Sequence, residues 1–217
     1  MKKPYLVIIL IIAIVVSVVL VFGHKPAQAP TQTGTGNTAQ NNNPTPTSKY
    51  ANLPLERARE RVTKKPFGIY ITPQNSPVQP ERFSGYHTGV DYEIFIGEEN
   101  SDVAVNAICS GKLLQKRTVS GYGGVMIQSC VLNSQQVTVL YGHIKLASVS
   151  KNVGDSITQG EQLAILGKGY SAETDGERKH LHLGIHKGTT ISVLGYVQNQ
   201  QDLANWIDFE EYVKNNH

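Results

Sequence analysis

The sequence is poor in cysteine and in clustered charge, and both shortages narrow the function classes. Its 217 residues include only two cysteines, Cys109 and Cys130, and neither belongs to a Cys-x-x-Cys pair. A cysteine-ligated zinc site is therefore not expected. The formal net charge is only +3, and the basic residues are scattered along the chain rather than grouped. This balance argues against a dedicated nucleic-acid-binding protein, and we predict no nucleic-acid partner.

Strong amphipathic helices are also scarce from Pro66 onward. Short apolar segments follow one another there at spacings of roughly 8 to 12 residues, separated by glycine or polar turns. They are VAVNAICS, GKLLQKRTVS, GVMIQSCVL, QVTVLYGHI, DSITQGEQLAILG, KHLHLGIHKG and TTISVLGYV. The pattern predicts an all-β fold, an antiparallel sheet or sandwich, in a single domain over residues 66–217. We expect a short terminal helix over residues 201–214, anchored by Trp206 and Phe209.

An uncharged apolar run over residues 5–22 follows Lys2 and Lys3. About 18 apolar residues suffice to span a bilayer, and flanking lysines favour a cytoplasmic N-terminus. We therefore interpret residues 1–23 as a transmembrane signal anchor. It would hold the protein in the cell membrane by a single pass, with the domain outside the cytoplasm in the cell envelope. A cleaved signal peptide, with a site near residues 27–29, is the alternative and exports the domain equally.

Two further segments separate this run from the domain. Residues 24–50 are rich in Pro, Thr, Gln, Asn and Gly, which predicts a disordered linker. Residues 51–65 contain good helix formers with Pro54 near the start, which predicts a short helical segment. That segment would either pack on the domain or end the linker. In an exported chain the two cysteines are free to form a disulfide, with a pair of buried thiols as the alternative.

Two histidines separated by one residue mark the segment KHLHLGI. On a β-strand, His180 and His182 project from one face while Leu181 and Leu183 face the other. Two imidazoles held side by side on a rigid strand could supply one metal ligand and one general base. An exposed strand face with two solvated histidines explains the same spacing, so the pair alone decides nothing.

The segments HTGVD and LYGHI carry further candidate residues. His87 and Asp91 lie close enough, on a loop running into a strand, to ligate one zinc ion, although a hydrogen bond between them explains the pattern too. His143 ends an apolar strand just past a glycine, where it either turns toward a cleft or simply caps the strand. Together, His87, Asp91 and His182 form a donor set suited to zinc with a fourth position open. His143 and His180 remain as imidazoles that are not ligands.

In this order, YHTGVD, LYGHI and KHLHLGI resemble the three signature segments of the lysostaphin-like, or LytM-type, zinc metallopeptidases, which cut peptidoglycan cross-links. The likeness covers roughly residues 66–212 and includes four supporting segments. They are VNAICSGKL, GYGGVMIQ, VSKNVGDSITQGEQLAILG and NWIDFEEYV. GDSITQGEQLAILG also resembles a hairpin of lipoyl- and biotinyl-type domains, but it offers no carrier lysine in the expected turn, so we interpret it as scaffold.

The resemblance implies a role for each of the five site residues. The implied zinc ligands are His87, Asp91 and His182, and the implied catalytic histidines are His143 and His180. The family also uses a tyrosine in the transition state, for which Tyr70 and Tyr86 are the candidates.

The chain departs from the family pattern beside the histidine pair. The approach GKGYSAETDGERKHLH is longer and more charged than usual, and Gly184 stands where many members carry a larger polar residue. Both changes touch the expected cleft wall, so they bear on substrate choice more than on zinc binding.

The function implied by the resemblance is a membrane-anchored zinc metalloendopeptidase. It would hydrolyse the peptide cross-links of peptidoglycan with a zinc-activated water and a histidine as general base. One alternative is a catalytically inactive wall-binding module that activates another wall hydrolase, although every expected ligand is present here. Another is an active peptidase whose substrate is a protein outside the wall.

Overall fold

The computed structural model describes residues 53–216 of the chain. These residues fall in the second of the chain's two units, Pro44–His217. The predicted signal anchor, the predicted linker and the first two residues of the predicted helical segment lie outside the described residues. Within residues 53–216, no helix is long and apolar enough to cross a membrane.

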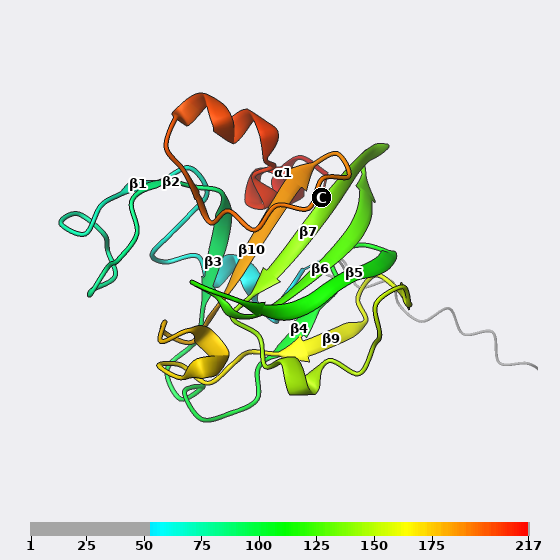
Figure 1. Ribbon diagram of the computed structural model, residues 1–217, viewed down its shortest axis with the longest axis horizontal. Coiled ribbons are helices and arrows are strands. Elements are labelled where there is room, and N and C mark those ends of the chain that lie inside the picture. The colour runs from blue at the N-terminus through cyan, green and yellow to red at the C-terminus, as the bar shows by residue number, and fades with distance from the viewer. Residues whose placement is uncertain (1–52, 217) are drawn as a thin grey trace, which may run out of the picture. The chain divides into compact units, whose positions relative to one another are not determined.

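A six-stranded antiparallel sheet carries most of the fold (Figure 1). Its strands lie in the order β3, β10, β7, β6, β5 and β8. Their bounds are β3 Gly89–Glu93, β5 Gly111–Val119, β6 Gly123–Leu132, β7 Gln135–Gly142, β8 Ser156–Ile157 and β10 His180–Lys187. The expected antiparallel all-β class is confirmed for the described part of the chain.

Two smaller sheets and a few short helices complete the described residues. The first small sheet has the order β1 (Tyr70–Ile71), β2 (Gly85–His87) and β11 (Tyr196–Val197), and the second pairs β4 (Ala104–Asn106) with β9 (Gln162–Ile165). The 3-10 helices are η1 Ala58–Glu60, η2 Leu146–Ser148, η3 Ala172–Thr174 and η4 Gln200–Asn205, and the α-helix is α1 Phe209–Asn216.

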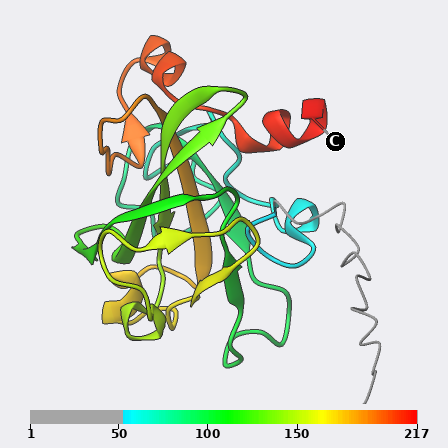
Figure 2. The ribbon, with the colours of Figure 1, turned by 90° about the vertical axis from the view of Figure 1, so that its right-hand side faces the viewer.

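The alternation expected for KHLHLGI is present in β10. Leu181, Leu183 and Ile185 belong to the main hydrophobic core. His180 and His182 therefore project from the opposite face of the sheet, because neighbouring side chains of a strand alternate. The β4–β9 ribbon supplies further core residues and lies beside one end of the main sheet, with β9 in front in the second view (Figure 2).

The segment that precedes the predicted domain boundary packs into the same core. Leu53, Leu55 and Ala58 are buried in it. Of residues 53–65, the described part of the predicted helical segment, only Ala58–Glu60 form a helical turn, η1. Of the two roles considered for this segment, packing on the domain is therefore the one observed.

The two cysteines form a disulfide. The Cα atoms of Cys109 and Cys130 are 6.0 Å apart, within the usual range for a disulfide. The bond joins the turn before β5 to strand β6, so it closes one hairpin of the main sheet.

The predicted terminal helix is interrupted at Trp206, which separates η4 from α1. Trp206 has extended backbone angles, φ −120° and ψ 165°, and forms a bridge with His186. The next amide, that of Ile207, donates to the carbonyl of Ile185 at 2.9 Å. Pairing with the edge of β10 therefore replaces one turn of helix. Trp206 and Phe209 are both buried, as predicted.

Candidate active site

Side chains from three strands converge on one point of the main sheet. His87 ends β2, Asp91 lies in β3 and His182 lies in β10. One donor atom of each residue lies within 4.8 Å of the other two, and all three residues are buried. Asp91 is paired directly opposite His182 across the two strands. Two imidazoles and a carboxylate gathered in this way could hold a metal ion.

His87 reaches this point because the chain changes sheets immediately after it. The sequence predicted a loop running into a strand that starts at Asp91, whereas the structure ends β2 at His87 and starts β3 at Gly89. Thr88 bridges the two strands, with its amide donating to the carbonyl of Gly195 at 3.0 Å and its hydroxyl to that of Leu194 at 2.6 Å. These hydrogen bonds hold the chain where it passes from β2 to β3, so that His87 and Asp91 point to the same place.

Contacts on the far side of the His87 and His182 rings fix which ring nitrogen of each faces the other donor atoms. Nδ1 of His87 donates to the carbonyl of Pro66 at 3.1 Å, so the lone pair of Nε2 faces Nδ1 of His182, 3.0 Å away. Nε2 of His182 lies 3.4 Å from the hydroxyl of Tyr122. Burial lowers the pKa of His182 to about 4, although Asp91 opposes the shift. Its ring is therefore neutral at neutral pH, as a ligating imidazole must be.

The two carboxylate oxygens of Asp91 face different partners. Oδ1 lies 3.1 Å from Nδ1 of His182 and 3.3 Å from Nε2 of His87. Oδ2 accepts a hydrogen bond from Nη2 of Arg178 at 2.8 Å and lies 3.3 Å from Nε2 of His180. Burial alone would raise the pKa of Asp91, but the imidazoles of His180 and His87 hold it well below its ordinary value. Asp91 is therefore ionised, with Oδ1 turned toward the two histidines.

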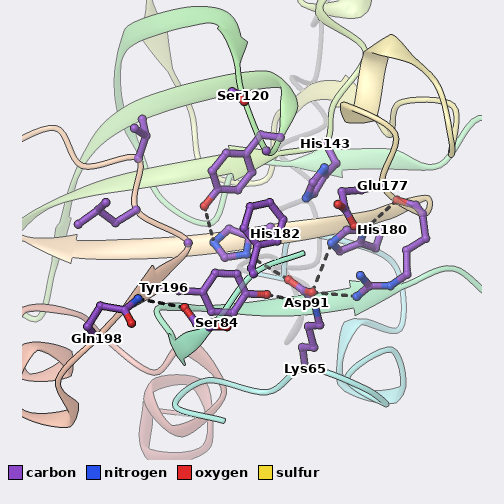
Figure 3. Close-up of a pocket in the computed structure, with 17 residues that line it drawn as sticks. Lys65, Ser84, Asp91, Ser120, His143, Glu177, His180, His182, Tyr196 and Gln198 are labelled. Atoms are coloured by element: carbon purple, nitrogen blue, oxygen red, sulfur yellow. Dashed lines mark hydrogen bonds and ion pairs between the residues drawn. The ribbon is translucent and has the colours of Figure 1, made fainter. Parts of the chain in front are cut away.

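His143 and His180 lie beside this group without belonging to it. Their ring centroids are 4.1 Å apart, and both side chains lie on the same side of His182 (Figure 3). Nδ1 of His180 donates to the carbonyl of Arg178 at 2.9 Å, which leaves Nε2 to face Asp91. The two rings are therefore held as a pair next to the carboxylate.

His143 has two unusual features. Its φ of 60° lies in the left-handed region, which is uncommon for a residue other than glycine and is often found at functional sites. Nδ1 of its buried ring has no hydrogen-bond partner among residues 53–216. Burial, together with the neighbouring His180, holds the pKa of His143 well below its ordinary value. His143 is therefore a neutral imidazole, the form in which one ring nitrogen can accept a proton.

The structure thus brings together all five residues predicted from the sequence. They are His87, Asp91, His143, His180 and His182. His186, the next histidine on β10, instead packs edge-on against Trp206, with 4.9 Å between ring centroids.

The tyrosines at the site are not the predicted candidates. The rings of Tyr70 and Tyr86 contact each other instead, tilted by 55° with 4.8 Å between their centroids. Tyr122 and Tyr196 line the cavity of about 280 Å³ that opens onto the histidines. Burial raises the pKa of Tyr122, and the nearby Asp91 carboxylate raises it further, so its hydroxyl keeps its proton. Tyr122 lies in the turn of the GYGG segment, and its position between two glycines is the signal that could have found it.

Loops far apart in sequence are tied together along the rim of this cavity. Arg82 donates to the carbonyl of Asp175 at 2.7 Å and to the Glu177 carboxylate at 2.8 Å. The Asp175 carboxylate accepts from the amide of Gly121 at 2.7 Å. The charged approach therefore forms part of the cavity wall through Glu177 and Arg178, as predicted, whereas Gly184 is not among the lining residues.

Comparison with known proteins settles the family. The sequence pattern that defines peptidase family M23 matches residues 85–200, which make up more than half of the chain. The chain belongs to peptidase family M23. The resemblance of its motifs to LytM-type peptidases is therefore confirmed at the level of the family.

Individual relatives of this M23 chain are distant. Endolysin 2638A of Staphylococcus phage 2638A is 26% identical over 140 residues, which are 58% of this chain and only 27% of the endolysin. The solved structure of LytU is 22% identical with a TM-score of 0.48, covering 71% of this chain and 85% of LytU. A zinc-containing peptidase from Vibrio cholerae is 18% identical with a TM-score of 0.40, covering 63% and 36%. With TM-scores below 0.5, the family assignment rests on the matched residues alone.

Proposed function

We propose that this M23 chain is a zinc metalloendopeptidase that hydrolyses the peptide cross-links of peptidoglycan. The observation that carries the proposal is the convergence of His87, Asp91 and His182, whose donor atoms lie within 4.8 Å of one another. This group lies beside the paired imidazoles of His143 and His180 and opens onto the cavity.

Zinc fits the group by the chemistry of its donors. Two neutral imidazoles and one carboxylate are a common set at catalytic zinc sites, where three protein ligands leave a position for water or substrate. His87 would offer Nε2, His182 would offer Nδ1 and Asp91 would offer Oδ1. When bound there, zinc would lower the pKa of a water molecule to about 7 and polarise the scissile carbonyl.

The chain's own residues would handle the protons. Because burial keeps His143 neutral, its imidazole can accept a proton from the attacking water. His180 lies against it and keeps its Nδ1 proton on the carbonyl of Arg178. One of the two would act as general base, and the other would donate to the developing oxyanion or to the leaving amine. Tyr122, whose hydroxyl lies in the same cavity, is a further donor to the oxyanion.

The proposed location follows from the sequence. Residues 1–23 would anchor the protein in the cell membrane by a single pass, and residues 24–50 would act as a linker. The domain would then face peptidoglycan in the cell envelope. The apolar run with its two preceding lysines supports this proposal.

An inactive wall-binding module is the less favoured function. Such a module needs no proton acceptor, whereas this chain keeps three converging donors and two buried imidazoles next to them. An active peptidase with a protein substrate outside the wall would use the same site. Incubation with purified peptidoglycan distinguishes that function from the hydrolysis of wall cross-links.

The proposal is tested by incubating the full-length protein with purified peptidoglycan, with chelator and after zinc is restored. Mass spectrometry of the released fragments would identify the bond that is cut. We expect His143→Ala to keep one zinc per chain and to lose about 100- to 10,000-fold in turnover. Asp91→Ala is expected to lose both zinc and activity. Full turnover by His143→Ala would overturn the assigned role, and intact peptidoglycan after incubation with the zinc-loaded wild type would overturn the substrate.

A further inference from the structure

A buried arginine lies directly behind the proposed zinc ligands. Arg178 belongs to the irregular segment that leads into β10, and its side chain is only 7% exposed. Nη2 of Arg178 donates to Oδ2 of Asp91 at 2.8 Å. A buried guanidinium next to a cation site needs an explanation, because its charge opposes the binding of a metal ion.

Glu93 holds Arg178 in this position. Nε of Arg178 donates to both carboxylate oxygens of Glu93 at 3.0 Å, and Nη2 donates to Oε1 as well. Glu93 lies two residues after Asp91 on β3, so both carboxylates project from the same face of one strand. The ammonium of Lys64 lies 3.3 Å from Glu93. Two carboxylates and two cations therefore balance, and the charge of Arg178 is offset where it is buried.

The consequence for Asp91 is geometric. Because Oδ2 is occupied by Arg178, only Oδ1 is turned toward His87 and His182. The planar guanidinium contacts two carboxylates at once, so its double contact with Glu93 fixes the nitrogen that holds Oδ2 of Asp91. A lysine in the same place would supply the charge without the fork.

We propose that Arg178 is a positioning residue that, anchored by Glu93, holds Asp91 as a ligand through a single oxygen. This inference rests on the proposed zinc site. Its effect is exerted through Asp91, and Arg178 itself need not touch substrate. The charged segment before the histidine pair thus serves the metal centre as well as the cavity wall.

A double variant distinguishes the effect of the charge of Arg178 on zinc affinity from the effect of its hydrogen bond to Asp91. Arg178→Met alone would remove a repelling charge and leave Glu93 without its buried counter-charge, with Lys64 still 3.3 Å away, so two opposite effects on zinc affinity would mix. Combining Arg178→Met with Glu93→Gln removes one positive and one negative charge and leaves the local sum unchanged. Arg178→Lys keeps the charge and removes the fork. Arg57→Met is the matched control, because Arg57 forms an exposed pair with Glu60.

The measurements are the zinc Kd of the full-length protein, by competition with a chelating indicator, and the visible spectrum after loading with Co²⁺. For the double variant we expect the zinc Kd to rise by about 10- to 100-fold, the usual effect of losing a partner of a metal ligand. Its cobalt spectrum should change in shape, because Oδ2 becomes free. Arg178→Lys should weaken binding less, and Arg57→Met should match the wild type.

Each outcome bears on one proposal only. A double variant with the wild-type zinc Kd and an unchanged cobalt spectrum would overturn the role of Arg178. If circular dichroism shows that the double variant is unfolded, Arg178→Lys decides, and a wild-type Kd and spectrum for that folded variant would overturn the role equally. A wild-type protein that binds no zinc would instead overturn the proposed function.

Discussion

At the scale of single residues, the site depends on a glycine that makes room for a ligand. A Cβ atom at Gly89 would lie 2.7 Å from Nε2 and Cε1 of His182 and 2.6 Å from the carbonyl oxygen of Leu183. Real Cβ atoms do not come so close to other atoms, so the ring would have to move. Gly184 lies opposite Gly89 on β10, but a Cβ there would meet its nearest atoms at 3.4 Å, which is ordinary contact.

Gly89→Ala is therefore expected to weaken zinc binding and to destabilise the fold by about 1–3 kcal/mol, the usual cost of overpacking. Gly184→Ala, on the facing strand, is expected to keep the zinc affinity of the wild type. Titration with zinc and urea unfolding measure the two effects. Equal zinc affinity in the two variants would show that His182 does not need the space at Gly89.

Two features of the site differ in how far the local sequence predicts them. The shared face of His180 and His182 follows from strand periodicity, which is a local property. The pairing of Arg178 with Glu93 is different, because it depends on the register between β10 and β3. Register is fixed by packing across the whole sheet, so charges 85 positions apart give no local sign of their contact.

At the scale of elements, a buried ion pair joins the segment before β1 to the loop after it. Lys65 and Glu81 pair with side chains only 3% and 2% exposed, and Lys65 also donates to the hydroxyl of Tyr196 at 3.1 Å. Glu81→Gln would leave the ammonium of Lys65 buried without its counter-charge. We expect a loss of about 3–5 kcal/mol in the free energy of unfolding. Glu60→Gln, which breaks the exposed pair with Arg57, should cause no measurable loss in the same urea titration.

The pair of Lys65 and Glu81 also predicts that the stability of the fold depends on pH. Burial alone would raise the pKa of Glu81, but hydrogen bonds from Lys65, the amide of Phe83 and Ser76 hold it below its ordinary value. A carboxyl with a lowered pKa stabilises the fold fully above its unfolded pKa and loses that contribution as the pH falls through the folded pKa. The stability difference between wild type and Glu81→Gln should therefore shrink in acid. A difference that stays constant down to the acid limit of folding would contradict this assignment.

The disulfide makes a prediction at the same scale. Cys109 and Cys130 are 21 positions apart, and closing a loop of that length stabilises a fold by about 3 kcal/mol in the chain-entropy model. The Cys109→Ser/Cys130→Ser variant is expected to lose about that much in urea unfolding, and reductant should then have no further effect on it. Unfolding of the variant at the wild-type urea midpoint would show that the bond adds nothing.

Elements near the ends of the sheet were the ones that the sequence predicted least well. The segment TTISVLGYV reads as a strand by its apolar residues, yet only Tyr196 and Val197 pair, and Val193 and Leu194 line the cavity instead. Trp206 breaks the predicted terminal helix for a similar reason, since it pairs with the edge of β10. In both places a tertiary contact outweighs local propensity. The long strands β5, β6, β7 and β10 were predictable because their own side chains carry the signal.

At the scale of the whole molecule, the working unit is longer than the part that matches the family. The family match begins at residue 85, but the carbonyl of Pro66 accepts the rear hydrogen bond of His87. The carbonyl of Lys65 accepts from the amide of Asp91 at 3.0 Å. Residues upstream of both, Leu53 and Leu55, are buried in the core. Residues 53–67 therefore support two of the three proposed zinc ligands from behind.

Two truncated chains distinguish the contribution of residues 53–67 from that of the linker. A chain that starts at residue 53 keeps every contact described above and is expected to bind zinc with the affinity of the full-length protein. A chain that starts at residue 68 loses the rear partner of His87, the backbone partner of Asp91 and the buried Lys65. It should show a zinc Kd raised by at least about 10- to 100-fold, or fail to fold cooperatively. Thermal unfolding with and without zinc measures both properties on the same samples, because a bound metal raises the midpoint. If the shorter chain kept the wild-type midpoint and its zinc-dependent shift, residues 53–67 would be dispensable for folding and for zinc binding.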